Sequence, residues 1–241
     1  MIIKEYQTTI VKIKQETPLV KTFRLKLQEP EKIEFLPGQF VMVSLKTHDE
    51  KLAKTTRAYS ISSSPNENDH VEITLNAHGP FTQAMFKLSE HAAMKAKGPY
   101  GKFYMDKNIQ EDIALFGAGT GISPLMSMLR HITDENMKNK VTMIYSVKQP
   151  SDIIFKDEIV HIETKNKNFS FIPTITRLDE DNSKWEGLRG RVTKERIAEL
   201  IPDIAKRISF MCGPNEYVNA VTDMLKELSV PEHNIKREIW G

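Results

Sequence analysis

Hydrophobic and polar positions alternate over short stretches in the first part of the chain. Between residues 1 and 107, runs rich in Val, Ile, Thr and Phe are separated by turn-forming groups such as Leu36-Pro37-Gly38. Such runs are typical of β-strands. The predicted strands cover residues 3–11, 22–27, 40–45 and 71–75, and one short helix is expected near 81–88. Many short strands close together favour an antiparallel barrel or sandwich.

After residue 106 the pattern changes to strands that alternate with helices. The predicted strands are 113–116, 141–147, 169–174, 208–212 and 235–239, and the predicted helices are 123–131, 152–162, 193–201 and 215–228. Regular alternation with short connections indicates a doubly wound parallel sheet with helices on both faces. We therefore expect two domains, residues 1–108 and 109–241.

A glycine-rich turn follows the first strand of the second domain. The apolar run 113–116 stops at Gly117, Gly119 and Gly121, and helical spacing begins afterwards. Without side chains, these glycines would let a phosphate approach the N–H groups at the helix start. The common dinucleotide fingerprint would need a glycine where Ile122 stands, and here Pro124 closes the turn. The turn alone is therefore weak evidence of a nucleotide site.

Composition narrows the function classes. The chain has 241 residues, 39% of them hydrophobic, and a net charge of +2 from 34 Lys and Arg against 32 Asp and Glu. No chain-wide basic field favours nucleic acid or an anionic membrane. Residues 1–108 hold 16 basic and 12 acidic residues. This mild excess is compatible with an acidic protein partner, but also with an ordinary solvated surface.

Cys212 is the single cysteine. One thiol excludes an internal disulfide, a four-cysteine iron–sulfur cluster and a multi-cysteine zinc site, and it suits a reducing compartment. Neither a signal peptide nor an apolar run long enough to span a membrane is evident. We expect a cytoplasmic protein without a bound metal.

Two stretches of the first domain carry candidate anion-binding groups. Arg57 offers a planar fork for phosphate, Tyr59 shares its strand face, and Ser60 adds a hydroxyl. The segment from Ala77 to Thr82 resembles a loop entering a helix whose free N–H groups could bind a pyrophosphate. An ordinary strand and a plain capped helix are the alternatives.

Five motifs together resemble the ferredoxin–NADP reductase superfamily in order and spacing. They are Arg57-Ala58-Tyr59-Ser60, the turn 79–82, Lys97-Gly98-Pro99-Tyr100-Gly101-Lys102-Phe103, the turn 117–124, and Cys212-Gly213-Pro214. The resemblance implies a Greek-key FAD-binding barrel followed by an NAD(P)-binding α/β domain. The segment 98–103 is expected to be a structural turn between the domains.

The resemblance also implies roles on the FAD side. Arg57 would neutralise the pyrophosphate, Tyr59 would lie against the isoalloxazine, and Ser60 would bond near flavin N5. Phe81 and Thr82 would add backbone contacts. The remaining candidates on this side are Ala58, Asn76 and Gly79.

On the nicotinamide side, the resemblance places the NAD(P) pyrophosphate at Gly117, Gly119 and Gly121, with Thr120 facing the gap between nicotinamide and flavin. Cys212 would approach nicotinamide C4, although a buried cysteine that only fills space is the alternative. We expect a role in placing the ring and not a covalent nucleophile. Pro124, Gly213 and Pro214 complete this set.

Two further groups of residues extend the resemblance. Lys148, Arg177 and Arg191 could meet a 2′-phosphate, which favours NADPH over NADH, or they could be solvated surface charges. Trp240 could cover the flavin face that nicotinamide must reach, or cap the sheet, and Glu238 is the acidic candidate beside it.

Three functions remain open at this point. The first is a reductase that passes hydride from NAD(P)H to bound FAD and then electrons to a separate acceptor such as a ferredoxin, flavodoxin or oxygenase component. The second is a flavin reductase that uses free flavin as a substrate. The third is a non-catalytic nucleotide-binding assembly subunit. With one cysteine, any iron–sulfur partner is expected on another polypeptide.

Overall fold

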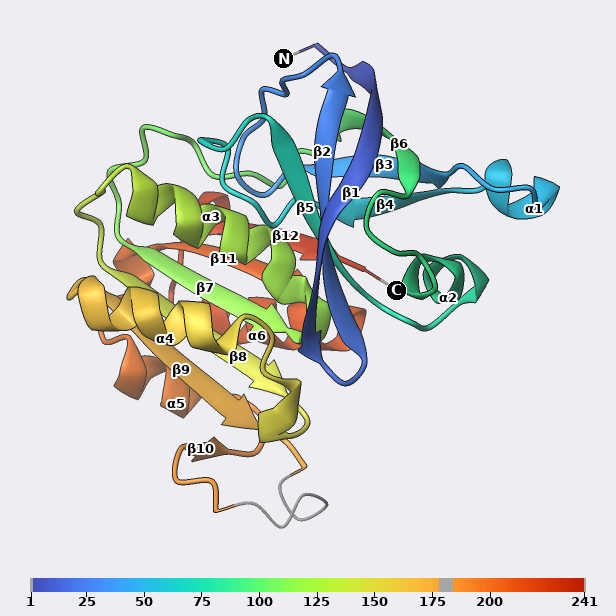
Figure 1. Cartoon of the computed structure of the whole chain (residues 1–241). Coiled ribbons are helices and arrows are strands. Elements are labelled where there is room, and N and C mark those ends of the chain that lie inside the picture. Colours follow the sequence, from blue (N-terminus) through green and yellow to red (C-terminus); the bar gives the residue numbers. More distant parts are fainter. Residues whose placement is uncertain (1, 178–183, 241) are drawn as a thin grey trace. The chain divides into compact units, whose positions relative to one another are not determined.

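The structure, a computed structural model, describes residues 2–177 and 184–240. The chain forms two compact units (Figure 1). The barrel unit comprises Met1–Lys107 and Met126–Glu135, and the sheet unit comprises Asn108–Leu125 and Asn136–Gly241. Helix α3 (Ile122–Asp134) therefore contributes its first turn to the sheet unit and its remaining turns to the barrel unit.

Six antiparallel strands form the barrel unit. They are β1 (Lys4–Thr17), β2 (Val20–Glu29), β3 (Phe40–Leu45), β4 (Thr56–Ser60), β5 (His70–Asn76) and β6 (Ala93–Tyr100). Their order is β4-β3-β6-β1-β2-β5. An antiparallel bridge between Ile61 and Ile73 joins the two outer strands, so the sheet closes on itself. The antiparallel barrel expected from the sequence is confirmed.

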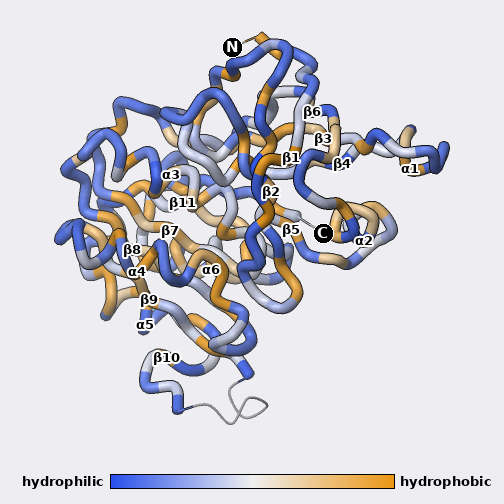
Figure 2. Tube along the Cα trace, in the orientation of Figure 1, coloured by the Kyte–Doolittle hydropathy of each residue, from blue (hydrophilic) through white to orange (hydrophobic). Residues whose placement is uncertain are grey.

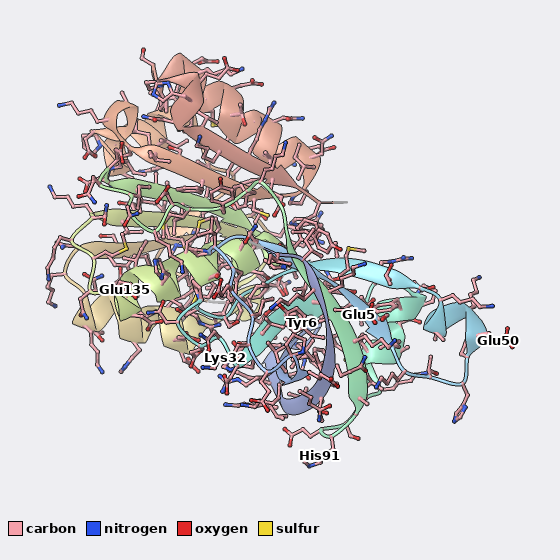
Figure 3. All side chains as sticks on the ribbon, turned by 90° about the horizontal axis from the view of Figure 1, so that it is seen from above. Glu5, Tyr6, Lys32, Glu50, His91 and Glu135 are labelled. Carbon is pink, nitrogen blue, oxygen red and sulfur yellow. The ribbon has the colours of Figure 1, made fainter. Side chains whose placement is uncertain are left out.

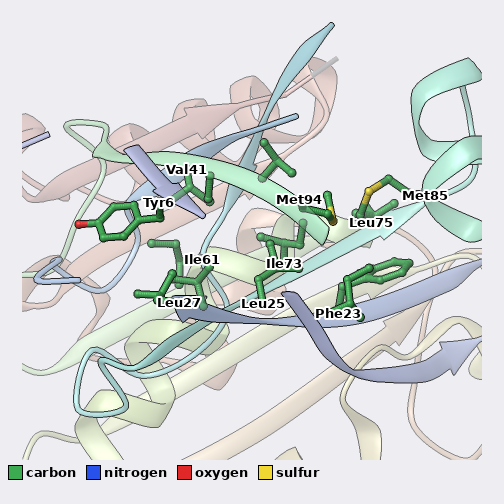
Figure 4. Close-up of a cluster of buried hydrophobic side chains, with 14 of the residues drawn as sticks. Tyr6, Phe23, Leu25, Leu27, Val41, Ile61, Ile73, Leu75, Met85 and Met94 are labelled. Carbon is green, nitrogen blue, oxygen red and sulfur yellow. The ribbon is translucent and has the colours of Figure 1, made fainter. Parts of the chain in front are cut away.

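Alternation along the strands builds the core of the barrel unit. Phe23 and Leu25 on β2 are fully buried, and β5 contributes Ile73 in the same way (Figure 4). On β1, Tyr6 is buried while its neighbour Glu5 is exposed and pairs with Lys95 at 3.3 Å (Figure 3). Because successive side chains point to opposite faces, the period of two in the sequence fixes which residues enter the core.

The sheet unit is an all-parallel, doubly wound sheet, as predicted. Its strands are β7 (Ile113–Ala118), β8 (Val141–Val147), β9 (Phe169–Ile175), β10 (Leu188–Arg189), β11 (Ile208–Gly213) and β12 (Ile235–Ile239), in the order β10-β9-β8-β7-β11-β12. From β7 the chain adds β8 and β9 on one side and β11 and β12 on the other. The order thus reverses between β7 and β11, where open α/β sheets bind ligands.

Helices cover the parallel sheet. Helices α5 (Lys194–Leu200) and α6 (Asn215–Glu227) pack Ile197 and Val218 with Phe116 and Met211 in one buried cluster. Helix α4 (Lys156–Lys165) lies on the opposite face (Figure 1). Figure 2 shows hydrophobic positions along β7 and β8, whose residues are all buried. Burial on both faces explains why β7 is a continuous apolar run and why β8, although it contains Thr142 and Ser146, shows no alternation of buried and exposed residues.

Some elements differ from the sequence-based expectation. Strand β6 covers Gly98, Pro99 and Tyr100, so only the end of the segment expected as a turn lies outside a strand, where Gly101 has φ +105°. Helix α2 (Pro80–Phe86) lies close to its expected position. Helix α1 (Glu50–Ala53) was not predicted, and it lies at the far end of the excursion between β3 and β4 (Figures 1 and 3). No helix in the described ranges is both long and apolar enough to span a membrane.

Residues of α3 are held on the outside of the barrel unit by polar contacts. Glu72 on β5 lies 2.9 Å from Arg24 and 2.7 Å from Arg130 of α3. Arg130 also donates to the carbonyl of Ser62 at 2.8 Å, and Ser127 donates to that of Ser63 at 2.7 Å. Burial alone would raise the pKa of Glu72, but the two guanidinium groups outweigh it and hold the pKa below its ordinary value. One carboxylate thus balances two cations on this face.

We expect Glu72→Gln to lower the free energy of unfolding by about 2 kcal/mol at pH 7, because two partly buried guanidinium groups lose their counter-charge. A carboxylate with a lowered pKa stabilises the fold above its unfolded pKa, near 4.3, and loses that effect as the pH falls through the folded value. The difference between wild type and variant should therefore shrink below about pH 4. Urea denaturation at pH 7 and at pH 3.5 measures both effects.

The control is Glu50→Gln, which breaks a pair with Lys54 whose side chains are 89% and 81% exposed. This exposed pair should contribute almost nothing. Equal denaturation midpoints for Glu72→Gln and Glu50→Gln would contradict the assignment of Glu72 as the counter-charge that holds α3.

Candidate functional site

Strand β4 and helix α2 bring together two of the motifs in the barrel unit. The ring of Tyr59 stacks against that of Phe81, with centroids 6.3 Å apart and planes 27° apart. Burial raises the pKa of Tyr59 to about 12, against the opposing effect of the Arg57 charge. Tyr59 therefore remains a neutral, half-buried ring at physiological pH, which is suitable for stacking on a flat ligand.

The turn before α2 presents bare backbone. Thr82 accepts a hydrogen bond from the Gly79 N–H at 2.9 Å and donates to the Gly79 carbonyl at 3.0 Å. Pro80 fills the first helical position. A methyl group on Gly79 would meet no atom of the chain within 4 Å. The space over this backbone is open, so the first turn of α2 can be approached by a ligand.

The other candidates in the barrel unit lie on β4 and β5. Arg57 is exposed, and one of its terminal nitrogens donates to the Thr56 carbonyl at 2.9 Å. Ala58 is exposed in the middle of β4, and Ser60 ends β4 opposite Phe40. Asn76 ends β5, three residues before Gly79. Arg57 keeps further donors, because a guanidinium carries five N–H groups.

In the sheet unit, the glycine turn has the expected form of strand, turn and helix. Strand β7 ends at Ala118, the 3₁₀ turn η1 covers Gly119–Gly121, and α3 starts at Ile122. Gly119 has φ +52°, a conformation that side chains disfavour. A Cβ on Gly121 would lie 2.6 Å from the Cys212 carbonyl carbon and 2.8 Å from the Gly213 nitrogen. Only glycine fits at this close approach.

Six sequence candidates meet at the carboxyl ends of β7, β11 and β12. Cys212 is paired in register with Gly117 on one side and with Glu238 on the other. The Trp240 N–H donates to the Gly213 carbonyl at 3.2 Å, and the indole ring lies 3.9 Å from where a Cβ on Gly119 would be. Trp240 thus lies against the glycine turn, at the point where the strand order reverses.

The chemistry of Cys212 follows from its burial. Burial raises the pKa of the thiol, and the charge of Glu238 raises it further. A buried neutral thiol is a poor nucleophile, since the reactive species is the thiolate. The role of Cys212 in placing the nicotinamide ring stays a prediction.

The three candidate cations for a 2′-phosphate follow neighbouring strands. Lys148 follows β8, Arg177 follows β9, and Arg191 follows β10, and all three are exposed. The Arg177 N–H donates to the Lys148 carbonyl at 2.9 Å, so the chain segments at these two positions are in contact.

Pro214, before α6, is exposed, whereas Pro124 in α3 is buried.

Two residues that support the glycine turn were missed from the sequence. The Tyr145 hydroxyl donates to the Gly119 carbonyl at 2.9 Å, and the Ser123 hydroxyl donates to the Thr120 carbonyl at 2.8 Å. Tyr145 lies in a strand of seven buried residues, where the pattern shows only that it is buried.

In the part of the chain that the structure describes, no group of three or more His, Cys, Asp or Glu side chains could hold a metal ion.

Comparison with known proteins gives the family. Residues 7–104 match the model of the oxidoreductase FAD-binding domain, and residues 115–223 match that of the oxidoreductase NAD-binding domain. The solved ferredoxin NADP⁺ reductase of Neisseria gonorrhoeae, with bound FAD and NADP, has the same fold, with a TM-score of 0.80 at 21% identity over 98% of both chains.

Curated relatives are similar over nearly the whole of this chain. The glycine betaine monooxygenase reductase subunit of Chromohalobacter salexigens is 31% identical over 234 residues, which is 96% of this chain and 63% of that protein. The NADH oxidoreductase HCR of Escherichia coli is 30% identical over 90% of this chain and 63% of that protein. The chain thus spans under two thirds of the length of these relatives.

The fold and the two matches give the chain an oxidoreductase FAD-binding domain followed by an oxidoreductase NAD-binding domain. The chain belongs to the ferredoxin–NADP reductase superfamily.

The open space at Gly79 gives a test of the FAD site. Gly79→Ala should leave the melting temperature of the flavin-free protein unchanged, because φ is −133° and a Cβ would meet no neighbour. If a pyrophosphate lies against this backbone, the methyl group should weaken FAD binding about tenfold or more. Flavin fluorescence titration measures the affinity.

Gln83→Ala, on the exposed side of the same helix, is the matched control and should leave both quantities unchanged. Unaltered FAD affinity in Gly79→Ala would remove this turn from the site.

Proposed function

We propose that this protein is an FAD-dependent NAD(P)H oxidoreductase that passes electrons to a separate acceptor. The observation that carries the proposal is the meeting of the glycine turn with Cys212 and Gly213 at the reversal of strand order, in a chain whose other unit is an FAD-binding domain. The reversal of strand order is a nucleotide-binding position in open α/β sheets. The FAD-binding domain would supply the redox cofactor.

On the FAD side, the proposed role of the residues is to bind FAD and to orient its isoalloxazine ring. Arg57 supplies a cation for the pyrophosphate, and the first turn of α2, after Gly79, supplies the backbone amides of Phe81 and Thr82. Tyr59 offers a neutral ring for the isoalloxazine, and Ser60 a hydroxyl near flavin N5. Ala58 and Asn76 flank these positions on β4 and β5. Bound FAD would accept hydride from NAD(P)H and release electrons singly or in pairs.

On the nicotinamide side, the glycine turn receives the pyrophosphate and Cys212 places the ring. A neutral buried thiol next to the turn can contact nicotinamide without reacting with it. Thr120, in the turn, and Trp240, beside it, border the same ligand position, and Glu238 lies next to Cys212 in register. Because hydride transfer needs C4 of nicotinamide near N5 of flavin, at roughly 3–3.5 Å, placement is the main task of these residues.

Exposed cations support NADPH as the donor. Lys148, Arg177 and Arg191 follow three neighbouring strands, and Arg side chains suit a terminal phosphate. The relative named NADH oxidoreductase favours the other donor. We propose NADPH on the charges of this chain, with NADH as the competitor in the test below.

The acceptor is proposed from the relatives and the charge distribution. One relative is the reductase subunit of a monooxygenase, which favours an oxygenase component as acceptor. The 16 basic against 12 acidic residues of positions 1–108 favour an acidic surface, such as that of a ferredoxin or flavodoxin. We also propose domain limits of 1–108 and 109–241, and, on the single cysteine, work in the reducing cytoplasm.

Purification and anaerobic mixing test the function. Protein that stays yellow through gel filtration binds FAD tightly, whereas colourless protein that reduces added flavin is a flavin reductase. NADPH and NADH are then mixed in turn with the flavin-loaded protein under anaerobic conditions, and bleaching at 450 nm is followed. Failure of both donors to bleach the flavin would leave a non-catalytic nucleotide-binding subunit. Reduction of ferredoxin, flavodoxin and cytochrome c then ranks the acceptors.

Cys212→Ala should slow anaerobic flavin reduction about tenfold or more, because the nicotinamide ring loses a contact that fixes the distance from its C4 atom to flavin N5. FAD occupancy should stay unchanged, since Cys212 belongs to the sheet unit. Stopped-flow absorbance measures the rate, and absorbance per protein measures occupancy. Cys212→Ser, which keeps the size of the side chain, should be slowed less. A wild-type rate in Cys212→Ala would return the thiol to the role of space-filling core.

A further inference from the structure

Tyr145 supports the glycine turn from inside the sheet unit. It is fully buried on β8, and its ring lies 3.2 Å from where a Cβ on Gly117 would be. Its hydroxyl reaches past the end of β7 and donates to the Gly119 carbonyl at 2.9 Å. Burial raises the pKa of this phenol, so it stays protonated and remains a donor at every working pH.

The hydrogen bond fixes the direction of one peptide plane. In a trans peptide the C=O and N–H point in opposite directions. Because the Gly119 carbonyl points to the buried phenol, the N–H of Thr120 in the same peptide points away from it. Thr120 and Gly119 are partly exposed, whereas Tyr145 is not. The Thr120 N–H therefore points towards the open side of the turn.

The carbonyl groups of the turn are occupied from within. The N–H of Ile122 also donates to the carbonyls of Gly119 and Thr120. Ser123 adds its hydroxyl to the Thr120 carbonyl. Oxygen lone pairs that would repel an anion are thus satisfied inside the protein, while N–H groups at a helix start have no acceptor in the helix.

Glycine makes this restraint necessary. A glycine at φ +52° has access to many backbone conformations, including ones that would turn the carbonyl outwards. A carbonyl facing a pyrophosphate would repel it. The side chain that selects the outward N–H is therefore as important for anion binding as the missing side chain at Gly119.

We propose that Tyr145 is a positioning residue that orients the Gly119–Thr120 peptide so that the Thr120 N–H binds the pyrophosphate of the dinucleotide. This inference rests on the proposed function, since it assigns the pyrophosphate of NAD(P)H to the glycine turn. Tyr145 acts through the backbone and does not touch the ligand.

The test removes one hydroxyl and keeps the ring. Tyr145→Phe in the FAD-loaded protein should bind ADP-ribose about 5- to 10-fold more weakly, as measured by calorimetry, because the Thr120 N–H is no longer held outwards. FAD content should remain at the wild-type level. In ¹⁵N spectra of the wild type, the Thr120 amide should shift on addition of ADP-ribose, and the shift should be smaller in the variant.

Tyr217→Phe is the matched control. Tyr217 packs against the core of the same unit, and its buried hydroxyl faces Ser146 and is not hydrogen-bonded to the glycine turn. This variant should bind ADP-ribose as the wild type does, because it also removes one buried tyrosine hydroxyl but leaves the Gly119 carbonyl with its partner.

Each remaining outcome has a distinct meaning. Wild-type affinity in Tyr145→Phe, or a wild-type Thr120 amide that does not move when ADP-ribose binds, overturns the role of Tyr145. So does a loss of affinity accompanied by equal losses of FAD content and melting temperature, which is a general structural effect. A wild-type protein that binds no ADP-ribose at all refutes instead the proposed nucleotide site.

Discussion

The candidate nucleotide site depends on one close approach between two backbone segments. Gly121 lies so near the backbone of Cys212 and Gly213 that any side chain would collide with main-chain atoms, which cannot move aside as a flexible side chain can. This contact brings the turn after β7 against the end of β11. The register of β11 with β12 then brings Glu238 and, two residues further along the chain, Trp240 to the same edge.

Both units use the same arrangement at their candidate sites. Polar side chains bind the turn from the protein side, while glycine leaves the outer side of the backbone bare. In the barrel unit Thr82 holds Gly79, and in the sheet unit Tyr145 holds the carbonyl of Gly119. A ligand therefore meets main-chain N–H groups whose orientation is already set, which lowers the entropy lost on binding.

The fold could be predicted from the sequence because the first unit consists of many short β-type runs, whereas in the second unit buried strands alternate with segments of helical spacing. Strand β6 was missed because Lys95, Lys97, Gly98 and Pro99 interrupt its apolar positions, and α1 because four residues are too few for a helical period. The hydrophobic pattern also predicted helix α3, but it did not predict that α3 packs on the barrel unit. Its polar residues Ser127 and Arg130 bind the outer face of the barrel unit, and an amphipathic pattern does not say which surface it will meet.

Some of the candidate site residues could be recognised from the sequence, whereas others could be found only from the fold. Glycines and a cysteine at strand ends could be recognised because their small size or position has a chemical reason. Tyr145 could not, because β8 is buried throughout and the sequence marks it only as core. The role of its hydroxyl depends on the position of Gly119, which is distant in sequence and adjacent only in the folded sheet unit.

The position of Trp240 also gives the protein a built-in optical reporter. The sequence contains two tryptophans, and this indole is 37% exposed and lies against the glycine turn. Indole emission depends on the polarity around the ring. With Trp185 replaced by phenylalanine, the remaining fluorescence would come from a single chromophore at that turn, and its colour and lifetime would follow events there without an attached dye.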